Sequence, residues 1–149
     1  MIDKITKQMY SKNMIPLFFN TITAGFPSPA TDYIESELDF NKFLVQNKAA
    51  TFAARAQGDS MINAGIFPGD IIIIDRSITP KSNDIIIASL DKEFTVKRLI
   101  KNGNRIFLHP ENSSYEDIEV FIDSDFQVWG VVTFTIHKLY GDKNAYCLN

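Results

Sequence analysis

The sequence predicts a mostly β fold, and two observations carry this prediction. Its apolar runs are short, and turn signals separate them at regular intervals. Almost no stretch shows the spacing of apolar residues that is typical of an amphipathic helix. The longest run, 126–137, alternates instead, with one face formed by Phe126, Val128, Val132, Phe134 and Ile136 and the other by Gln127, Trp129, Thr133, Thr135 and His137. Such alternation is typical of a strand with one buried face, so we expect a β-rich body.

Residues 1–40 predict an N-terminal arm, and residues 41–149 a body with a single core. Lysines and apolar side chains are scattered ahead of residue 20 and are interrupted by Pro16, so no domain is expected there. Pro27 and Pro29 favour an extended backbone in the segment that follows. Residues 31–45 have the content of one or two helical turns, which we expect to dock the arm onto the body.

Ala24-Gly25 is a pair of small residues just ahead of these prolines. An extended backbone with small side chains presents its carbonyl groups openly, as a protease substrate must. A plain linker has the same composition. From these residues alone, a cleavage site and a linker both remain open.

The body contains seven segments with the apolar content and the boundaries of strands. Four consecutive isoleucines, 71–74, predict a buried strand, because the run is too short for a free helix. Asn102-Gly103 is a strong hairpin signal, and the segment 90–93 predicts a second hairpin turn. We expect strands at 51–56, 71–75, 84–90, 94–100, 105–108, 118–122 and 126–137.

A serine lies between two glycines in Gly58-Asp59-Ser60-Met61, ahead of a short segment that ends at Gly65. We expect a tight turn that opens a short helical segment, with Asp59 or Ser60 as its cap. Backbone N–H groups would then gather beside the Ser60 hydroxyl. Ser60 is therefore either a nucleophile or only a helix cap.

Lys97 is the candidate partner of Ser60. Strand periodicity places Thr95, Lys97 and Leu99 on one face, among short or apolar neighbours and away from carboxylates. An ordinary surface lysine is the alternative. To act as a base near neutral pH, the amine needs burial that lowers its pKa, and it could then take the proton of a nearby serine hydroxyl.

Composition narrows the class of protein. The chain has 149 residues, 45% of them hydrophobic, and a net charge of −3, so a nucleic-acid-binding surface is not expected. Cys147 is the single cysteine, which excludes an internal disulfide and suits a reducing compartment. No apolar run is long enough to span a membrane. We expect a soluble, cytoplasmic protein without a cofactor.

Two histidines offer a weaker alternative site. His109 and His137, with Asp59 and Asp70 as possible partners, could form a Ser-His-Asp arrangement with Ser60. His137 lies on the outer face of its predicted strand, which disfavours this arrangement. One cysteine and two separated histidines do not make a metal site, so none is expected.

Five motifs in this order resemble the LexA-like self-cleaving serine peptidases of family S24, and among them the UmuD type. The resemblance covers nearly the whole chain, and the motifs read Ala24-Gly25-Phe26-Pro27-Ser28-Pro29-Ala30, Gly58-Asp59-Ser60-Met61, Gly69-Asp70, Glu93-Phe94-Thr95-Val96-Lys97 and Pro110-Glu111-Asn112-Ser113-Ser114-Tyr115. The resemblance implies a β-clip peptidase body with a mobile N-terminal arm, assembled as a homodimer. The tail 141–149 and the pair Glu116-Asp117 depart from the family pattern.

The resemblance also implies the site. Ser60 would be the nucleophile and Lys97 the general base, and Ala24-Gly25 would be the bond that the protein cuts in itself. Backbone N–H groups of Asp59 and Ser60 would form the oxyanion hole. Cleavage would be stimulated by the RecA filament on single-stranded DNA. The shortened protein would then act with a UmuC-type Y-family DNA polymerase in translesion synthesis, as part of the SOS response.

Other classes of protein remain as alternatives. A LexA-like repressor shares the peptidase body but needs a helix-turn-helix module, and the segment before Gly25 is too short for one. A catalytically silent interaction subunit would not need both Ser60 and Lys97. A membrane-bound signal peptidase with a Ser-Lys pair would need a membrane span.

Overall fold

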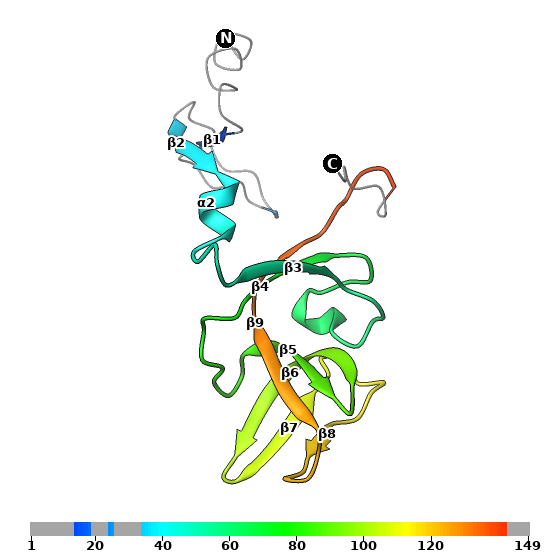
Figure 1. The fold of residues 1–149 in the computed structure, drawn as a ribbon. Coiled ribbons are helices and arrows are strands. Elements are labelled where there is room, and N and C mark those ends of the chain that lie inside the picture. Colours follow the sequence, from blue (N-terminus) through cyan, green and yellow to red (C-terminus); the bar gives the residue numbers. More distant parts are fainter. Residues whose placement is uncertain (1–13, 19–23, 26–33, 143–149) are drawn as a thin grey trace. The chain divides into compact units, whose positions relative to one another are not determined.

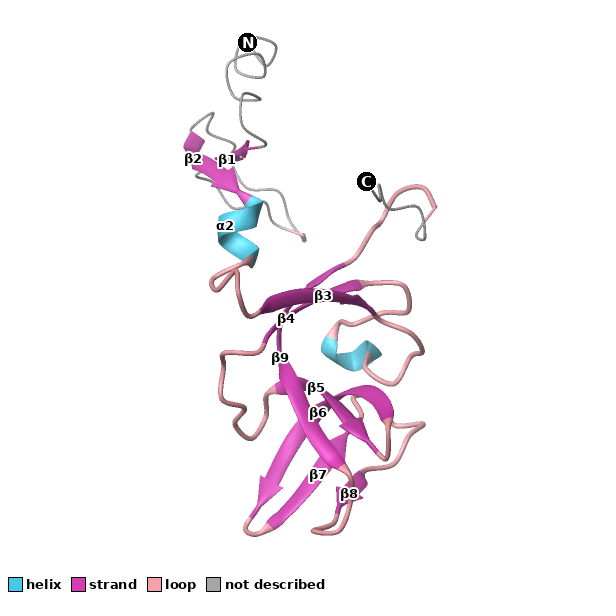
Figure 2. Cartoon of the chain, in the orientation of Figure 1, coloured by secondary structure: helices cyan, strands magenta, loops and turns pink. Residues whose placement is uncertain are grey.

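A computed structural model describes residues 14–18, 24–25 and 34–142 of the chain (Figure 1). The chain divides into two compact units, Met1–Gln46 and Asn47–Asn149. Strands dominate both, all paired antiparallel, so the predicted mostly β fold is confirmed (Figure 2). Among the helices of the described residues, none has the length and apolar character needed to cross a membrane.

The first unit pairs two short strands and ends in a helix. Strand β1 (Met14–Phe18) runs antiparallel to β2 (Ile34–Asp39), with Met14 opposite Asp39. Helix α2 (Phe40–Leu44) follows at once, and the Asp39 carboxylate caps it by accepting from the N–H of Asn41 at 3.0 Å. The predicted helical turn lies here. The strand pair escapes prediction because its partners are distant in sequence and Pro16 lies inside β1, on an edge where proline is tolerated.

The second unit is a seven-stranded sheet in the order β3-β4-β9-β5-β6-β7-β8. Each predicted strand of the body is present, with ends that move by a few residues. The elements are β3 (Thr51–Arg55), the 3-10 helix η2 (Ile62–Ala64), β4 (Ile71–Asp75), β5 (Ile85–Leu90), β6 (Glu93–Asn102), β7 (Arg105–His109), β8 (Ile118–Val120) and β9 (Phe126–Ile136).

Both predicted hairpins form on either side of β6. Between β5 and β6 the turn residues Asp91 and Lys92 have positive φ angles of 49° and 70°, as a tight two-residue turn requires. Between β6 and β7 Asn102 pairs with Arg105, so the turn itself is Gly103-Asn104. Gly103 supplies the positive φ, at 60°. These hairpins fix the register of the strand that carries Lys97.

Strand β9 joins the two halves of the sheet. Its first part pairs with β5 and its second part with β4, and Val131 pairs with both (Figure 1). Each pairing contains a register shift, at Trp129 against β5 and at Thr133 against β4. The predicted clean alternation of this strand is therefore wrong, because each bulge reverses the faces beyond it. Trp129, expected on the polar outer face, instead packs against the core.

The core is divided in the same way. One cluster, around Ile72 and Ile74, packs the β3–β4 half against Met61 and Ile66 of the segment that follows Ser60. The other, around Ile86 and Leu99, lies between β5, β6, β7 and β9. Ser60 is thus held by the first half of the sheet, whereas Lys97 belongs to a strand of the second.

Gly130 lies where β9 passes from one half to the other, and its lack of a side chain is needed there. A methyl group at this position would stand 2.5 Å from Cγ2 of Ile74 and 3.0 Å from the Asp75 carbonyl oxygen. Ile74 is fully buried and cannot easily move away. We expect Gly130→Ala to lower the free energy of unfolding by about 2–3 kcal/mol, the cost of overpacking a core.

Urea-induced unfolding measures this loss, and Gln127→Ala, at an exposed position of the same strand, is the matched control. A Gly130→Ala protein as stable as the control would show that β9 can shift to make room, against the close approach described here.

Candidate active site

Ser60 lies in the turn between β3 and η2, and backbone contacts fix both ends of the loop that contains it. The N–H of Ala56 donates to the Asp70 carbonyl at 2.8 Å, and the N–H of Gly69 donates back to the Ala56 carbonyl at 2.9 Å. Gly58 takes a positive φ of 77° just before the turn. Met61, only 3% exposed, anchors the chain immediately after Ser60. The hydroxyl therefore stands on a loop whose base is closed.

The predicted cap by Asp59 or Ser60 is wrong. Met61 occupies the cap position of η2 and makes no side-chain cap. The N–H groups at the start of this single turn bond to backbone carbonyls instead, Asn63 to Glu111 at 2.9 Å and Ala64 to Met61 at 3.0 Å. Because these donors are already satisfied, the Ser60 hydroxyl is available for another partner.

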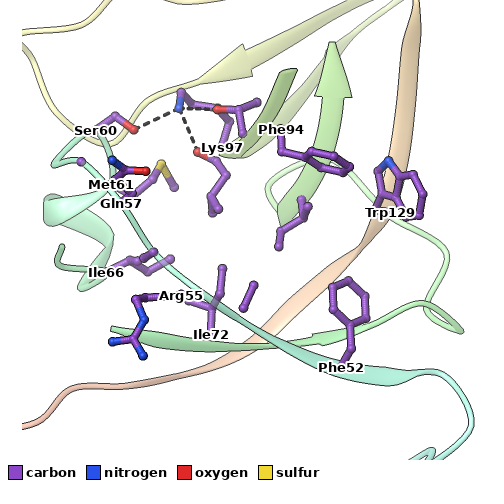
Figure 3. A pocket seen from close by; sticks show the side chains of 16 residues that line it. Phe52, Arg55, Gln57, Ser60, Met61, Ile66, Ile72, Phe94, Lys97 and Trp129 are labelled. Atoms are coloured by element: carbon purple, nitrogen blue, oxygen red, sulfur yellow. Dashed lines mark hydrogen bonds between the residues drawn. The ribbon is translucent and has the colours of Figure 1, made fainter. Parts of the chain in front are cut away.

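That partner is Lys97, in the middle of β6. Its Nζ lies 3.0 Å from the Ser60 Oγ, 2.7 Å from the Thr95 Oγ1 and 3.0 Å from the Val96 carbonyl oxygen (Figure 3). Thr95 and Lys97 share a face of β6, as the alternation predicts. The lysine is 9% exposed, so it is not the ordinary surface lysine of the alternative interpretation.

Burial lowers the pKa of Lys97 from its ordinary value. No carboxylate contacts its amine among the described residues, so no counter-charge there opposes the desolvation. A neutral amine has two N–H donors and one lone pair. Val96 offers only a carbonyl acceptor and Thr95 a hydroxyl, so these two can take the N–H donors, which leaves the lone pair for the Ser60 hydroxyl. In this protonation state Ser60 donates and Lys97 accepts.

A pocket of about 530 Å³ opens beside the pair. Its wall is apolar and comes from the first core cluster, with Phe52, Ile66 and Ile72, while Arg55 and Gln57 add polar groups. The rings of Phe94 and Trp129 lie beside each other, 5.4 Å between centroids, and also line it (Figure 3). Its size and lining suit a few residues of an extended peptide with small or apolar side chains.

The predicted oxyanion donors lie in the same turn. In the described part of the chain, no hydrogen bond occupies the N–H of Asp59 or of Ser60. Both groups are therefore free to bind a developing negative charge beside the Ser60 Oγ. Ala24 and Gly25 belong to the first unit, where they form an exposed bend with open space around Gly25. The catalytic and cleavage roles of these residues stay predictions.

The histidines pair with carboxylates away from Ser60. His137 bonds through Nδ1 to Asp70, which is 1% exposed and also accepts from the Phe67 N–H at 2.8 Å. His109 bonds to Asp117. Neither histidine lines the pocket, so the Ser-His-Asp alternative does not form around Ser60. The expected outer-face position of His137 is also wrong, because its ring turns to a buried aspartate beyond the Thr133 bulge. No cluster of metal-ligating side chains occurs among the described residues.

Three residues that contact the site, Thr95, Asn112 and Tyr115, have no role in the predictions from sequence. Thr95 bonds to the Lys97 amine, and its position two residues earlier on the same strand face was the available signal. Asn112 and Tyr115 contact Asp59 from more than fifty residues away, a proximity that no local pattern announces.

A serine hydroxyl thus lies against a desolvated lysine, beside an apolar pocket on a β body. The comparisons with known proteins identify the family. The chain belongs to the Peptidase S24-like family, whose model matches residues 16–133.

Curated relatives extend this result over most of the chain. Protein ImpA of Salmonella typhimurium is 46% identical over 123 residues, covering 83% of each chain. Protein MucA of the same species is 37% identical, covering 82% of this chain and 84% of its own. The LexA repressor of Caldicellulosiruptor saccharolyticus is 40% identical over 129 residues, which are 86% of this chain and 62% of that repressor.

The buried amine makes a prediction about stability. Below the lowered pKa of Lys97, the folded protein holds an ammonium group in a poorly solvated place. Between that pKa and the unfolded value of about 10.4, only the unfolded chain keeps the proton, so stability increases with pH across this window. We expect the free energy of unfolding to rise from pH 7 to pH 10 relative to a Lys97→Met variant, which has no amine to titrate.

Urea unfolding at each pH gives the comparison, with Lys101→Met, at an exposed position of the same strand, as the control. The desolvation argument fails if the free energy of unfolding changes with pH in the same way in the wild type, Lys97→Met and Lys101→Met. The Lys97 amine would then have an ordinary pKa.

Proposed function

We propose that this protein is a serine endopeptidase that cleaves its own chain between Ala24 and Gly25, as part of the SOS response to DNA damage. The observation that carries the proposal is the 3.0 Å contact between the Ser60 Oγ and the desolvated Lys97 amine. Membership in a peptidase family supports the class of reaction. Family resemblance and the exposed Ala24-Gly25 bend support the position of the cut.

The reaction proceeds through an acyl-enzyme. Neutral Lys97 takes the proton of the Ser60 hydroxyl as the Oγ attacks the Ala24 carbonyl carbon. The resulting oxyanion accepts from the N–H groups of Asp59 and Ser60. When the tetrahedral intermediate collapses, the Lys97 ammonium gives its proton to the nitrogen of Gly25, which leaves as a new amino terminus. Water, deprotonated by Lys97, then attacks the ester and restores Ser60.

The protonation state of Lys97 would make the reaction slow without a stimulus. At neutral pH a lysine is competent only in the fraction of molecules that have lost its proton, and docking of the arm over the pocket would exclude water and raise that fraction. A RecA filament on single-stranded DNA can act in this way by favouring the docked state, without adding a catalytic group. The filament would change only the fraction of molecules in the docked state.

The processed protein would work as a homodimer in the cytoplasm, with a UmuC-type Y-family DNA polymerase in translesion synthesis. The family resemblance of its motifs supports this role. A repressor that cleaves itself is the second candidate, and the LexA match favours it. Specific binding of operator DNA, measured with and without cleavage, separates the two.

Self-cleavage should release residues 1–24 and leave a body that begins at Gly25. Because Lys97 must be neutral, the unassisted rate should rise with pH by about tenfold per unit until the amine is mostly deprotonated. Addition of activated RecA filament should accelerate cleavage at pH 7 and flatten this dependence. Intact mass and N-terminal sequencing of the product, followed over time at each pH, measure both results.

A product that begins elsewhere would overturn the assignment of the bond. An unassisted rate that stays flat from pH 7 to pH 10 would overturn the lysine-base mechanism.

Substitution of either member of the pair should abolish cleavage. Ser60→Ala removes the nucleophile and Lys97→Ala the base, so each should reduce the rate at pH 9 by at least about a thousandfold, and the double variant should be no worse than either single one. Circular dichroism and size-exclusion chromatography check that the variants keep their fold. Lys101→Ala, on the same strand, is the control for loss of a lysine.

Cleavage of Lys97→Ala at close to the wild-type rate would show that another group serves as the base. A folded wild-type protein that never cleaves, with filament or without, would favour a silent interaction subunit.

A further inference from the structure

A second group of contacts reaches the turn that contains Ser60, and it comes from a loop about fifty residues further along the chain. The loop 111–115, which follows β7, touches the residue immediately before Ser60 at two points. Asn112 donates from Nδ2 to the Asp59 carbonyl at 2.9 Å, and the Tyr115 hydroxyl donates to the Asp59 carboxylate. A third contact joins the loop to η2, where the N–H of Asn63 donates to the Glu111 carbonyl at 2.9 Å.

The loop is itself braced. Asn112 uses both ends of its side-chain amide, because its Oδ1 accepts from the Ser114 N–H at 3.0 Å while its Nδ2 reaches Asp59. The N–H of Tyr115 donates to the Asn112 carbonyl at 3.1 Å, which closes a turn. Asn112 and Tyr115 are therefore held in one short structure, and the two contacts to Asp59 act together.

The loop is anchored beside the base. Arg98 follows Lys97 in β6 and points to the opposite face, where its guanidinium pairs with the Glu111 carboxylate and donates to the Asn83 carbonyl. One strand therefore positions the Lys97 amine directly and, through Arg98 and the loop 111–115, also positions the turn that carries Ser60. The distance between the two reacting atoms is set from both sides.

We propose that the loop 111–115 is a positioning element for the nucleophile, with Asn112 fixing the Asp59 peptide and Tyr115 fixing the Asp59 side chain. This role rests on the proposed function. Neither residue touches the reacting atoms, so both act through Asp59. The Asn112 contact orients the peptide group between Asp59 and Ser60, whose N–H would serve the oxyanion. The Tyr115 contact fixes the Asp59 side chain and, with it, the backbone that leads into Ser60.

The Tyr115 contact also persists under the conditions in which Lys97 becomes a base. The hydrogen bond to the negative Asp59 side chain raises the pKa of Tyr115 above its ordinary value. The phenol therefore keeps its proton as the pH rises into the range where the Lys97 amine loses its own. Loss of one such bond should not alter how Lys97 is buried, because Tyr115 lies outside the pocket lining.

The test is the pH profile of self-cleavage in the full-length protein. Tyr115→Phe removes only the hydroxyl, and it should lower the plateau rate at alkaline pH about fivefold while leaving the pH of half-maximal rate unchanged. Tyr140→Phe removes the same group from a tyrosine that is 92% exposed and should stay within about twofold of wild type. Asn112→Asp keeps the oxygen that accepts from the Ser114 N–H, but it replaces the donor to the Asp59 carbonyl by a second oxygen. The two oxygens then repel each other, and the plateau rate of cleavage should fall about tenfold.

A double-mutant cycle asks whether Tyr115 acts through Asp59. In an Asp59→Ala background, which keeps the backbone N–H, Tyr115→Phe should change the plateau rate by less than about twofold. The positioning role is overturned if Tyr115→Phe cleaves as fast as wild type, if it costs the same factor in both backgrounds, or if it shifts the half-maximal pH. Ser60→Ala, measured alongside, separates this failure from that of the proposed function: cleavage that survives Ser60→Ala refutes the nucleophile, whatever Tyr115 does.

Discussion

The contact between Ser60 and Lys97 depends on keeping an amine out of water, and much of the fold serves that condition. The amine has no carboxylate partner among the described residues and only uncharged oxygens around it, so burial lowers its pKa without an opposing counter-charge. Burial costs stability at neutral pH, because the ammonium loses solvent without gaining a counter-charge. Arg105, by contrast, pairs with the opposite charge of Glu119.

The two reacting groups come from different halves of the sheet, so the bend in β9 determines whether they meet. A bulge at Trp129 and another at Thr133 let one strand pair with β5 and then with β4. Gly130 allows the close crossing between them. The first bulge also turns the Trp129 ring to the pocket side, where it lies against Phe94. The irregularities of β9 therefore join the two halves, and the bulge at Trp129 also completes the wall of the candidate site.

Short-range patterns predict the parts of this site, and long-range contacts assemble them. The strands, the hairpins and the Ser60 turn follow from residue spacing, and motif resemblance joins Ser60 with Lys97. Strand alternation fails at Trp129 because a bulge depends on the pairing partners of β9, which its own sequence does not name. The expected outer-face position fails for His137, because its buried partner Asp70, which Thr135 also contacts, lies far away in the chain. The bonds from Asn112 and Tyr115 to Asp59 are equally non-local. The sequence therefore shows that these residues are present, but it does not predict that they contact the turn before Ser60.

Two separate physical quantities would control a reaction of this kind. Burial of Lys97 sets the fraction of molecules in which the amine is neutral, whereas the loop 111–115 and the Ser60 turn set how well a competent molecule reacts. The first changes with pH and with docking of a peptide over the pocket, and the second is built into the folded body. This separation would suit the proposed self-cleavage, in which the protein stays intact until a signal arrives. A stimulus that changes only solvation can then start the reaction, because the geometry around Ser60 is already in place.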